Sequence, residues 1–192
     1  MEFIDEQPEV PPVVGTACDD GRGSLPYALL HGDSLVATAS EALGAAEIEL
    51  IDFTTPWTDL QERGCVVVLH DTLCPLTPPA FLAEIADGIA GSTVRVGVRP
   101  VTDTIKTATE EQVGETVDRD ALWTVTSPVV LAPQVVAALD AWPEGGDFAA
   151  LVERLREQFD LEPVTAPPLG RRVEDESDLA VLAAMAEDAQ ES

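Results

Sequence analysis

The sequence predicts an α/β domain built on an open, mostly parallel β-sheet. The run CVVVL at 65–69 is typical of a strand that is covered on both faces, as the strands of parallel sheets are. A segment with helical spacing follows at 78–89, and a second strand is expected at 93–98. This strand–helix–strand order indicates a sheet whose ligands sit beyond the carboxyl ends of its strands.

The whole chain suits one domain with a buried core, since it has 192 residues and 45% hydrophobic content. Residues 1–12 form an acidic, proline-rich leader that we expect to be flexible, so the domain spans 13–188. Before the central strand we expect a strand at 13–17, a helix at 35–43 that ends at Gly44, a strand at 48–53 and a helical turn at 56–63 closed by Gly64. After 93–98 we expect a strand at 122–126, helices at 133–141 and 148–159, a strand at 161–165 and a helix at 177–187 with Ser177 as its N-cap.

The composition excludes several classes of protein. With 36 acidic and 10 basic residues the formal net charge is −26, which argues against nucleic-acid binding and leaves a basic protein partner as an option. No apolar run approaches the roughly 20 residues of a membrane span, and the acidic start is unlike a signal peptide, so we expect a cytoplasmic protein without a membrane role. The three cysteines lack CxxC spacing and indicate neither a disulfide framework nor a zinc site.

The segment from 93 to 127 carries the most specific motifs. It contains Asp-Thr-Ile-Lys at 103–106 and Val-Asp-Arg-x-x-Leu-Trp at 117–123. Lys106 is the only lysine of the chain, and a lone ammonium in so acidic a protein favours contact with an anion. These motifs resemble the protruding arm of the 2-C-methyl-D-erythritol 4-phosphate cytidylyltransferases.

The resemblance implies a Rossmann-like nucleotidyltransferase domain with a mixed, mostly parallel sheet and a protruding β-arm at about 99–123, through which the family forms homodimers. It also implies transfer of CMP from CTP to methylerythritol phosphate with Mg²⁺, in non-mevalonate isoprenoid biosynthesis. Arg22 and Asp71 match residues of the nucleotide site, and Asp71 matches the acid near the metal. The positions that match substrate-binding residues are Thr104, Lys106, Arg119, Ser127 and Arg172.

Several of these residues have a structural alternative. Lys106, Thr104 and Arg119 are equally suited to holding the dimer contact of the arm. Asp71 also suits a strand-end turn, since aspartate favours such positions, and His70 suits the core. Arg171 and Arg172 are either a solvent-exposed pair or a pair that binds an anion. Cys74 is an ordinary thiol with no activating neighbour in the sequence.

The chain departs from the family pattern in the nucleotide site. Cys18 and Asp20 replace glycines of the triphosphate loop, and Tyr27 replaces a lysine. Cys74 replaces an arginine, and only the short stretch 54–64 stands where the family binds cytosine and ribose.

We therefore interpret the chain as a degenerate, non-catalytic homologue, a dimeric scaffold, regulator or small-anion-binding protein that requires no cofactor. The alternative is an active cytidylyltransferase that uses Mg²⁺.

Overall fold

The computed structural model describes residues 10–101, 106–109, 112–116 and 122–190. One six-stranded sheet forms the centre of the domain, with strand order β10-β6-β9-β5-β1-β4. The pairs β1–β4, β1–β5 and β6–β10 are parallel, whereas β9 is antiparallel to both β5 and β6. The expected mixed, mostly parallel sheet is confirmed. Its strands are β1 Val13–Cys18, β4 Glu49–Leu50, β5 Val66–Asp71, β6 Thr93–Pro100, β9 Trp123–Leu131 and β10 Asp160–Thr165.

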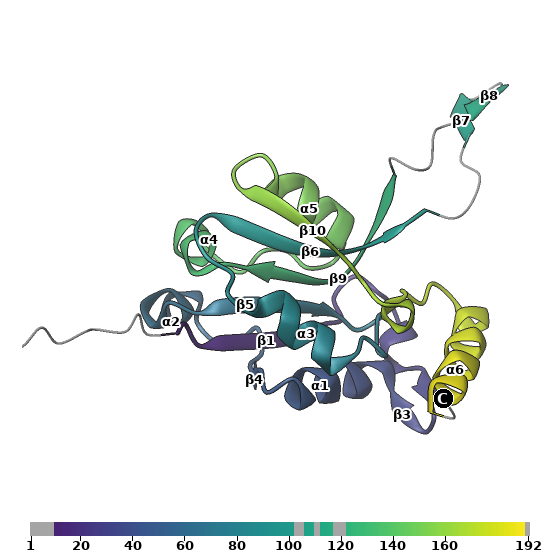
Figure 1. Cartoon of the computed structure of the whole chain (residues 1–192), viewed down its shortest axis with the longest axis horizontal. Coiled ribbons are helices and arrows are strands. Elements are labelled where there is room, and N and C mark those ends of the chain that lie inside the picture. Colours follow the sequence, from purple (N-terminus) through teal and green to yellow (C-terminus); the bar gives the residue numbers. More distant parts are fainter. Residues whose placement is uncertain (1–9, 102–105, 110–111, 117–121, 191–192) are drawn as a thin grey trace, which may run out of the picture.

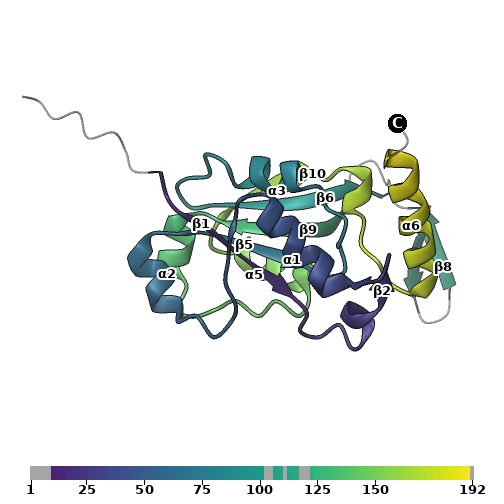
Figure 2. The ribbon, with the colours of Figure 1, turned by 90° about the horizontal axis from the view of Figure 1, so that it is seen from below.

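Helices cover both faces of this sheet (Figures 1 and 2). On one face lie α1 (Leu35–Ala45) and α3 (Pro79–Ala86), and on the other lie α4 (Pro133–Ala138) and α5 (Phe148–Leu155). The short α2 (Trp57–Arg63) packs beside α4 at one end of the sheet, and α6 (Glu176–Gln190) stands at the opposite end. Every residue of β5 is buried, as a strand between two helical layers requires.

The strands differ from expectation at two places. β9 continues to Leu131 instead of ending at 126, because its second half enters the core between β5 and β6, where all of its side chains are buried. The β6–β9 register shifts between Val96 and Val98, which makes a bulge at Gly97. Only glycine fits there, since a Cβ would lie 2.3 Å from the Ser127 carbonyl oxygen. The strand expected at 48–53 shrinks to β4, a two-residue edge strand.

Helix ends show which capping signals were interpreted correctly. Gly64 ends α2 with φ of 60°, as expected. Gly44 does not end a helix, because α1 continues to Ala45. Ser177 is not the N-cap of α6. Asp175 takes that role, and its carboxylate accepts hydrogen bonds from the Ser177 and Asp178 amides.

Two 3₁₀ turns and two small two-stranded sheets complete the described elements. Four short elements lie on the α6 side of the domain. They are the 3₁₀ turns η1 (Leu25–Tyr27) and η3 (Pro168–Gly170) and the paired strands β2 (Leu29–Leu30) and β3 (Asp33–Ser34). Strands β7 (Lys106–Thr109) and β8 (Gln112–Thr116) pair only with each other and stand away from the main sheet (Figure 1). Within the described residues, no helix is long and apolar enough to cross a membrane.

Candidate functional site

The carboxyl ends of β1 and β5 meet at one edge of the sheet, where Cys18 is paired with Asp71. A pocket of about 370 Å³ opens beside this edge. Gly21, Asp71 and Arg172 line one part of it, and the start of α5 at Phe148 lines another. The pocket therefore lies at the place that an open α/β sheet offers to ligands.

Two arginines hold the Asp71 carboxylate. The Arg22 Nε atom lies 2.6 Å from Asp71 Oδ1, which also accepts a hydrogen bond from the Leu73 amide at 2.9 Å. The Arg172 Nε atom lies 3.2 Å from Oδ2. Asp71 and Arg22 are almost inaccessible, whereas 34% of the Arg172 side chain is exposed. The three residues lie far apart in the sequence, and the fold brings them together.

Arg22 ties the first loop to the rest of the domain. Its Nη1 atom donates to the carbonyl oxygens of Asp20 and Gly145, and its guanidinium lies 5.3 Å from the ring centre of Phe148. Its Nη2 atom is buried and has no partner among the described residues. A guanidinium held in this way cannot leave the loop, so Arg22 fixes the position of Asp71.

Ser127 and His70 support Asp71 from inside the sheet. The Ser127 hydroxyl accepts a hydrogen bond from the Asp71 amide at 2.9 Å and lies 2.6 Å from His70 Nδ1. The direction of the hydrogen bond between Ser127 and Nδ1 depends on the imidazole tautomer, since the hydroxyl can both donate and accept. Burial lowers the pKa of His70 to about 4, against a smaller opposing effect of Asp71. Ser127 is fully buried, and its hydroxyl contacts both Asp71 and His70.

The first loop, 18–27, is more enclosed and more acidic than a glycine-rich phosphate loop. Cys18 is buried, and desolvation raises the pKa of its thiol to about 12. Gly21 adopts φ of 73°, and a side chain there would collide with Gly146. Tyr27 is exposed and donates a hydrogen bond from its hydroxyl to Asp19. The loop therefore supplies a carboxylate and a phenol where the family pattern has amides and an ammonium.

Cys74 and the stretch 54–64, two places where the sequence departs from the family pattern, both belong to the packed body of the domain. Cys74 is fully buried, and burial raises its pKa well above the usual thiol value, so it is an inert core residue. The stretch 54–64 forms α2, whose Trp57 donates to the Leu139 carbonyl oxygen and packs on Trp142. α2 lies at the end of the sheet opposite α6 (Figure 1), so it does not reach the pocket beside Asp71.

The described residues form no metal centre made of protein ligands alone. No group of three His, Cys, Asp or Glu side chains in the described part of the chain could hold an ion. Both oxygens of Asp71, the residue that sequence analysis matched to a metal ligand, accept hydrogen bonds from guanidinium groups. A cation that bound Asp71 in this arrangement would have to displace an arginine.

The structure places three of the residues that the resemblance singled out side by side. Arg22 and Arg172 both contact Asp71. Arg171 and Arg172 have different partners, since Arg171 pairs with Asp178 and Arg172 with Asp71. Lys106 begins β7 and nothing is described of its side chain, while Thr104 and Arg119 lie outside the described residues.

Two polar residues of this region were missed. Arg99 and Thr126 line a neighbouring pocket together with Arg171 and Arg172. Arg99 carried a signal that could have identified it, since it is one of only ten basic residues and ends a strand. Thr126 carried no such signal.

The sheet order, the helices on both faces and the carboxylate at the strand ends define an α/β domain of the nucleotidyltransferase type. A family model described as "IspD: 2-C-methyl-D-erythritol 4-phosphate cytidylyltransferase" matches residues 56–163, more than half of the chain. The chain belongs to this family. The matched residues include Asp71 and Ser127, whereas Arg22 and Arg172 lie outside them.

Curated relatives with the same name agree. The protein of Shouchella clausii is 35% identical over 99 residues, which are 49% of this chain and 43% of that relative. The protein of Rhodococcus jostii is 31% identical over 126 residues, 64% of this chain and 55% of the relative. The alignments thus span about half the length of these relatives.

Solved structures support the fold. The 2-C-methyl-D-erythritol 4-phosphate cytidylyltransferase of Thermus thermophilus superimposes with a TM-score of 0.63 at 19% identity, covering 92% of this chain and 99% of that chain. The 4-diphosphocytidyl-2C-methyl-D-erythritol synthase of Anaerococcus prevotii gives 0.65 at 12% identity, covering 92% and 97%. The expected fold class is therefore confirmed over nearly the whole domain.

Proposed function

We propose that this protein carries out the reaction in the name of its relatives, the transfer of CMP from CTP to methylerythritol phosphate. Membership of the family supports this proposal, as does one observation on the structure. A carboxylate held between two guanidiniums, Asp71 between Arg22 and Arg172, lines a pocket at the carboxyl ends of parallel strands. This is the position at which α/β sheets bind nucleotides.

The two arginines would have different roles in such a reaction. Arg22 is buried and keeps Asp71 in place, whereas Arg172 is partly exposed in the pocket. An anionic phosphate about 4 Å from Asp71 would meet a repulsion of roughly 4 kcal/mol at an effective dielectric constant near 20. Arg172 can offset this repulsion, because a guanidinium can bind a phosphate through two parallel hydrogen bonds.

The experiment that tests this function is a measurement of pyrophosphate release and nucleotide product with CTP, methylerythritol phosphate and Mg²⁺. We expect turnover that depends on both substrates and falls at least about tenfold in Arg172→Gln, since a charge-assisted phosphate contact is lost. Arg63→Gln is the control, because Arg63 forms an exposed pair with Glu49 away from the pocket. No turnover above background in the wild-type protein would contradict the proposal.

A second candidate function is anion binding without catalysis, in a scaffold or regulatory protein. The specific observation in its favour is Tyr27, which stands at the position of the family lysine and is hydrogen-bonded to Asp19. The first loop then lacks an ammonium to stabilise charge in the transition state, a loss on the order of 3 kcal/mol in the barrier. Saturable ligand binding with no pyrophosphate release would favour this candidate over the first.

Both candidates include a homodimer formed through the arm at about 99–123. The β7–β8 hairpin supports this proposal, since it stands away from the main sheet and pairs only with itself. Light scattering after size exclusion at micromolar concentration should give twice the mass of one chain, and a monomer would contradict it.

The variant Lys106→Ala tests whether this lysine holds the dimer or binds a ligand. Loss of the dimer indicates a structural contact, whereas loss of ligand binding alone indicates a ligand contact.

A further inference from the structure

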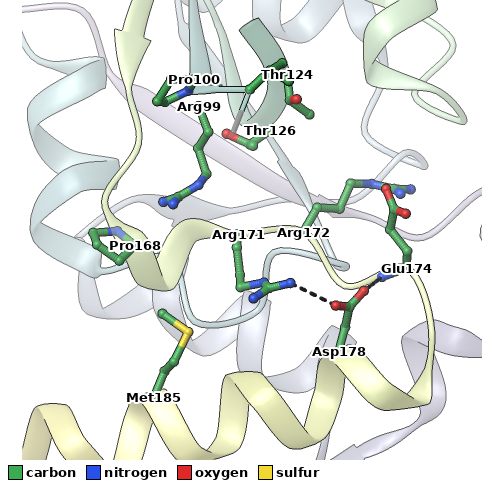
Figure 3. A pocket seen from close by; sticks show the side chains of 11 residues that line it. Arg99, Pro100, Thr124, Thr126, Pro168, Arg171, Arg172, Glu174, Asp178 and Met185 are labelled. Atoms are coloured by element: carbon green, nitrogen blue, oxygen red, sulfur yellow. Dashed lines mark hydrogen bonds and ion pairs between the residues drawn. The ribbon is translucent and has the colours of Figure 1, made fainter. Parts of the chain in front are cut away.

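Arg22 is the only basic residue of the first loop, yet it is closed off from the candidate pocket. Its side chain is 1% exposed, and it lines neither the pocket beside Asp71 nor the neighbouring one. Arg99 and Arg172, by contrast, both line the neighbouring pocket (Figure 3), and 34% of the Arg172 side chain is exposed. Part of the fold therefore separates the Arg22 guanidinium from the place where a ligand would lie.

The segment 143–147, which leads into α5, covers the first loop. The Gly145 carbonyl oxygen accepts a hydrogen bond from Arg22 Nη1 at 3.0 Å. A Cβ on Gly21 would lie 3.2 Å from the Gly146 Cα atom, so the two backbones are in contact at this point. Gly146 also lines the pocket beside Asp71, whereas Arg22 does not. The segment thus lies between the guanidinium and the pocket.

The closed arrangement does not require glycine at positions 145 and 146. Neither Gly145 nor Gly146 adopts the left-handed backbone conformation. A Cβ on Gly145 would lie 3.5 Å from Cys18 Sγ, and one on Gly146 would lie 3.8 Å from the Asp20 carbonyl oxygen, which are ordinary contact distances. Alanine would fit at both positions and would restrict the backbone more, so two successive glycines favour a segment that moves.

The closed arrangement also leaves one donor of Arg22 unused. Its Nη2 atom is buried and has no partner among the described residues. A buried donor without a partner has lost its hydrogen bond to water and gained none in return. If the segment moved away, Nη2 and the Nη1 donor now held by Gly145 would both face the pocket. Parallel donors of one guanidinium are suited to an anionic group.

We propose that the segment 143–147 is a latch, which closes the first loop and must move before the phosphates of a nucleotide can contact Arg22. The identity of the ligand rests on the proposed function, whereas the movement is a property of the chain itself. Asp147 anchors one end of the latch, because its carboxylate accepts hydrogen bonds from two amides of α5. The two glycines before Asp147 are then the hinge, since they can absorb the change in backbone angles.

The thiol of Cys18 reports on the latch without any ligand. Cys18 and Cys65 are both fully buried, but Cys18 lies under Gly145, whereas Cys65 precedes β5 at the other end of the sheet. We expect iodoacetamide to modify Cys18 at least about tenfold faster than Cys65, because local opening exposes the first thiol and unfolding of the core is needed for the second. Peptide mass spectrometry measures both rates in one sample, and equal rates would overturn the proposal.

Gly146→Ala tests whether the glycines are the hinge. The methyl group fits the closed state and restricts the open one, so we expect Cys18 to be modified about two- to fivefold more slowly than in the wild type. Gly44→Ala is the matched control, since it makes the same change within α1, away from the latch. Equal slowing by both variants would attribute the effect to general stability and would count against the hinge.

A disulfide can hold the latch closed. The Cβ that Gly145→Cys introduces would lie 3.7 Å from the Cys18 Cβ, a separation that disulfides accept. After oxidation we expect this variant to bind CTP with Mg²⁺ at least about tenfold more weakly than after reduction, in a calorimetric titration. Gly146→Cys is the control, because its new Cβ would face the Asp20 carbonyl oxygen and not Cys18.

The outcomes separate the latch from the proposed reaction. Equal CTP affinity in the oxidised and reduced forms of Gly145→Cys would overturn the latch. A count of free thiols that shows no disulfide would also do so, since the segment would then not lie on Cys18. Absence of CTP binding in every form would contradict only the proposed transfer reaction, because modification of Cys18 requires no nucleotide.

Discussion

The Arg22 guanidinium and the Asp71 carboxylate form an ion pair, 2.6 Å from Nε to Oδ1, in which the two side chains are only 1% and 2% exposed. The pair joins the loop after β1 to the end of β5, the two segments that border the candidate site. Because neither group can turn to water, each depends on the other, and the pair fixes the geometry of the pocket.

We predict that Asp71→Asn lowers the free energy of unfolding by about 3 kcal/mol or more, since it leaves the Arg22 charge buried without its counterion. Urea denaturation measures this change. Glu49→Gln is the control, because the Glu49–Arg63 pair is exposed and should contribute less than about 1 kcal/mol. Equal losses in the two variants would show that the buried pair has no special role.

Tyr27→Lys should increase cytidylyl transfer by about tenfold, because an ammonium at this position can stabilise charge that develops on a phosphate. The fold should be unaffected, since Tyr27 is exposed. Pyrophosphate release at saturating CTP measures the effect. Tyr27→Gln removes the phenol without adding a charge, and an equal increase in that variant would refute an electrostatic cause.

His70 should destabilise the protein as the pH falls from about 6.5 to about 4. Its pKa in the folded protein is about 4, because burial disfavours the charged imidazolium, whereas in the unfolded chain it is near 6.5. In this interval the unfolded state binds a proton that the folded state does not, so this group lowers stability by about 1.4 kcal/mol for each pH unit.

The measurement for His70 is a comparison of wild type with His70→Asn by urea denaturation across this pH range. The difference in unfolding free energy between the two proteins should shrink as the pH falls. An NMR titration should also show the His70 ring signals constant from neutral pH down to about pH 5. A ring that titrates near pH 6.5 would contradict burial of a neutral imidazole.

Gly97→Ala should destabilise the domain by about 2 kcal/mol or more, because the new methyl group would lie 2.3 Å from the Ser127 carbonyl oxygen. Gly44→Ala is the opposite case, since a Cβ there meets nothing closer than 3.9 Å and the residue lies within α1. That variant should gain roughly 0.5–1 kcal/mol. Thermal denaturation of both proteins tests the prediction, and a tolerated Gly97→Ala would show that β9 can shift at the bulge.

Local patterns in the sequence were sufficient for most of the fold. A run of β-branched residues or apolar residues at helical spacing indicates which side chains of one element are buried. β5 and α5 could therefore be predicted without knowing their neighbours. The second half of β9 could not, because its Ser-Pro interruption is unfavourable for a strand unless neighbouring strands enclose it on both sides. The cap of α6 was misplaced by two residues, since Asp175 and Ser177 are both acceptable N-cap residues.

The sequence by itself determined the fold class, the family and the shortage of cations in the first loop, because residue identities and their spacing are sufficient for each. Only the tertiary structure decided which charges meet. Arg22 pairs with Asp71 across 49 residues and Arg172 across 101, while Arg99 donates to the Pro167 carbonyl oxygen. Coulomb interactions depend on distance in space and on burial, and neither is encoded in the local order of residues.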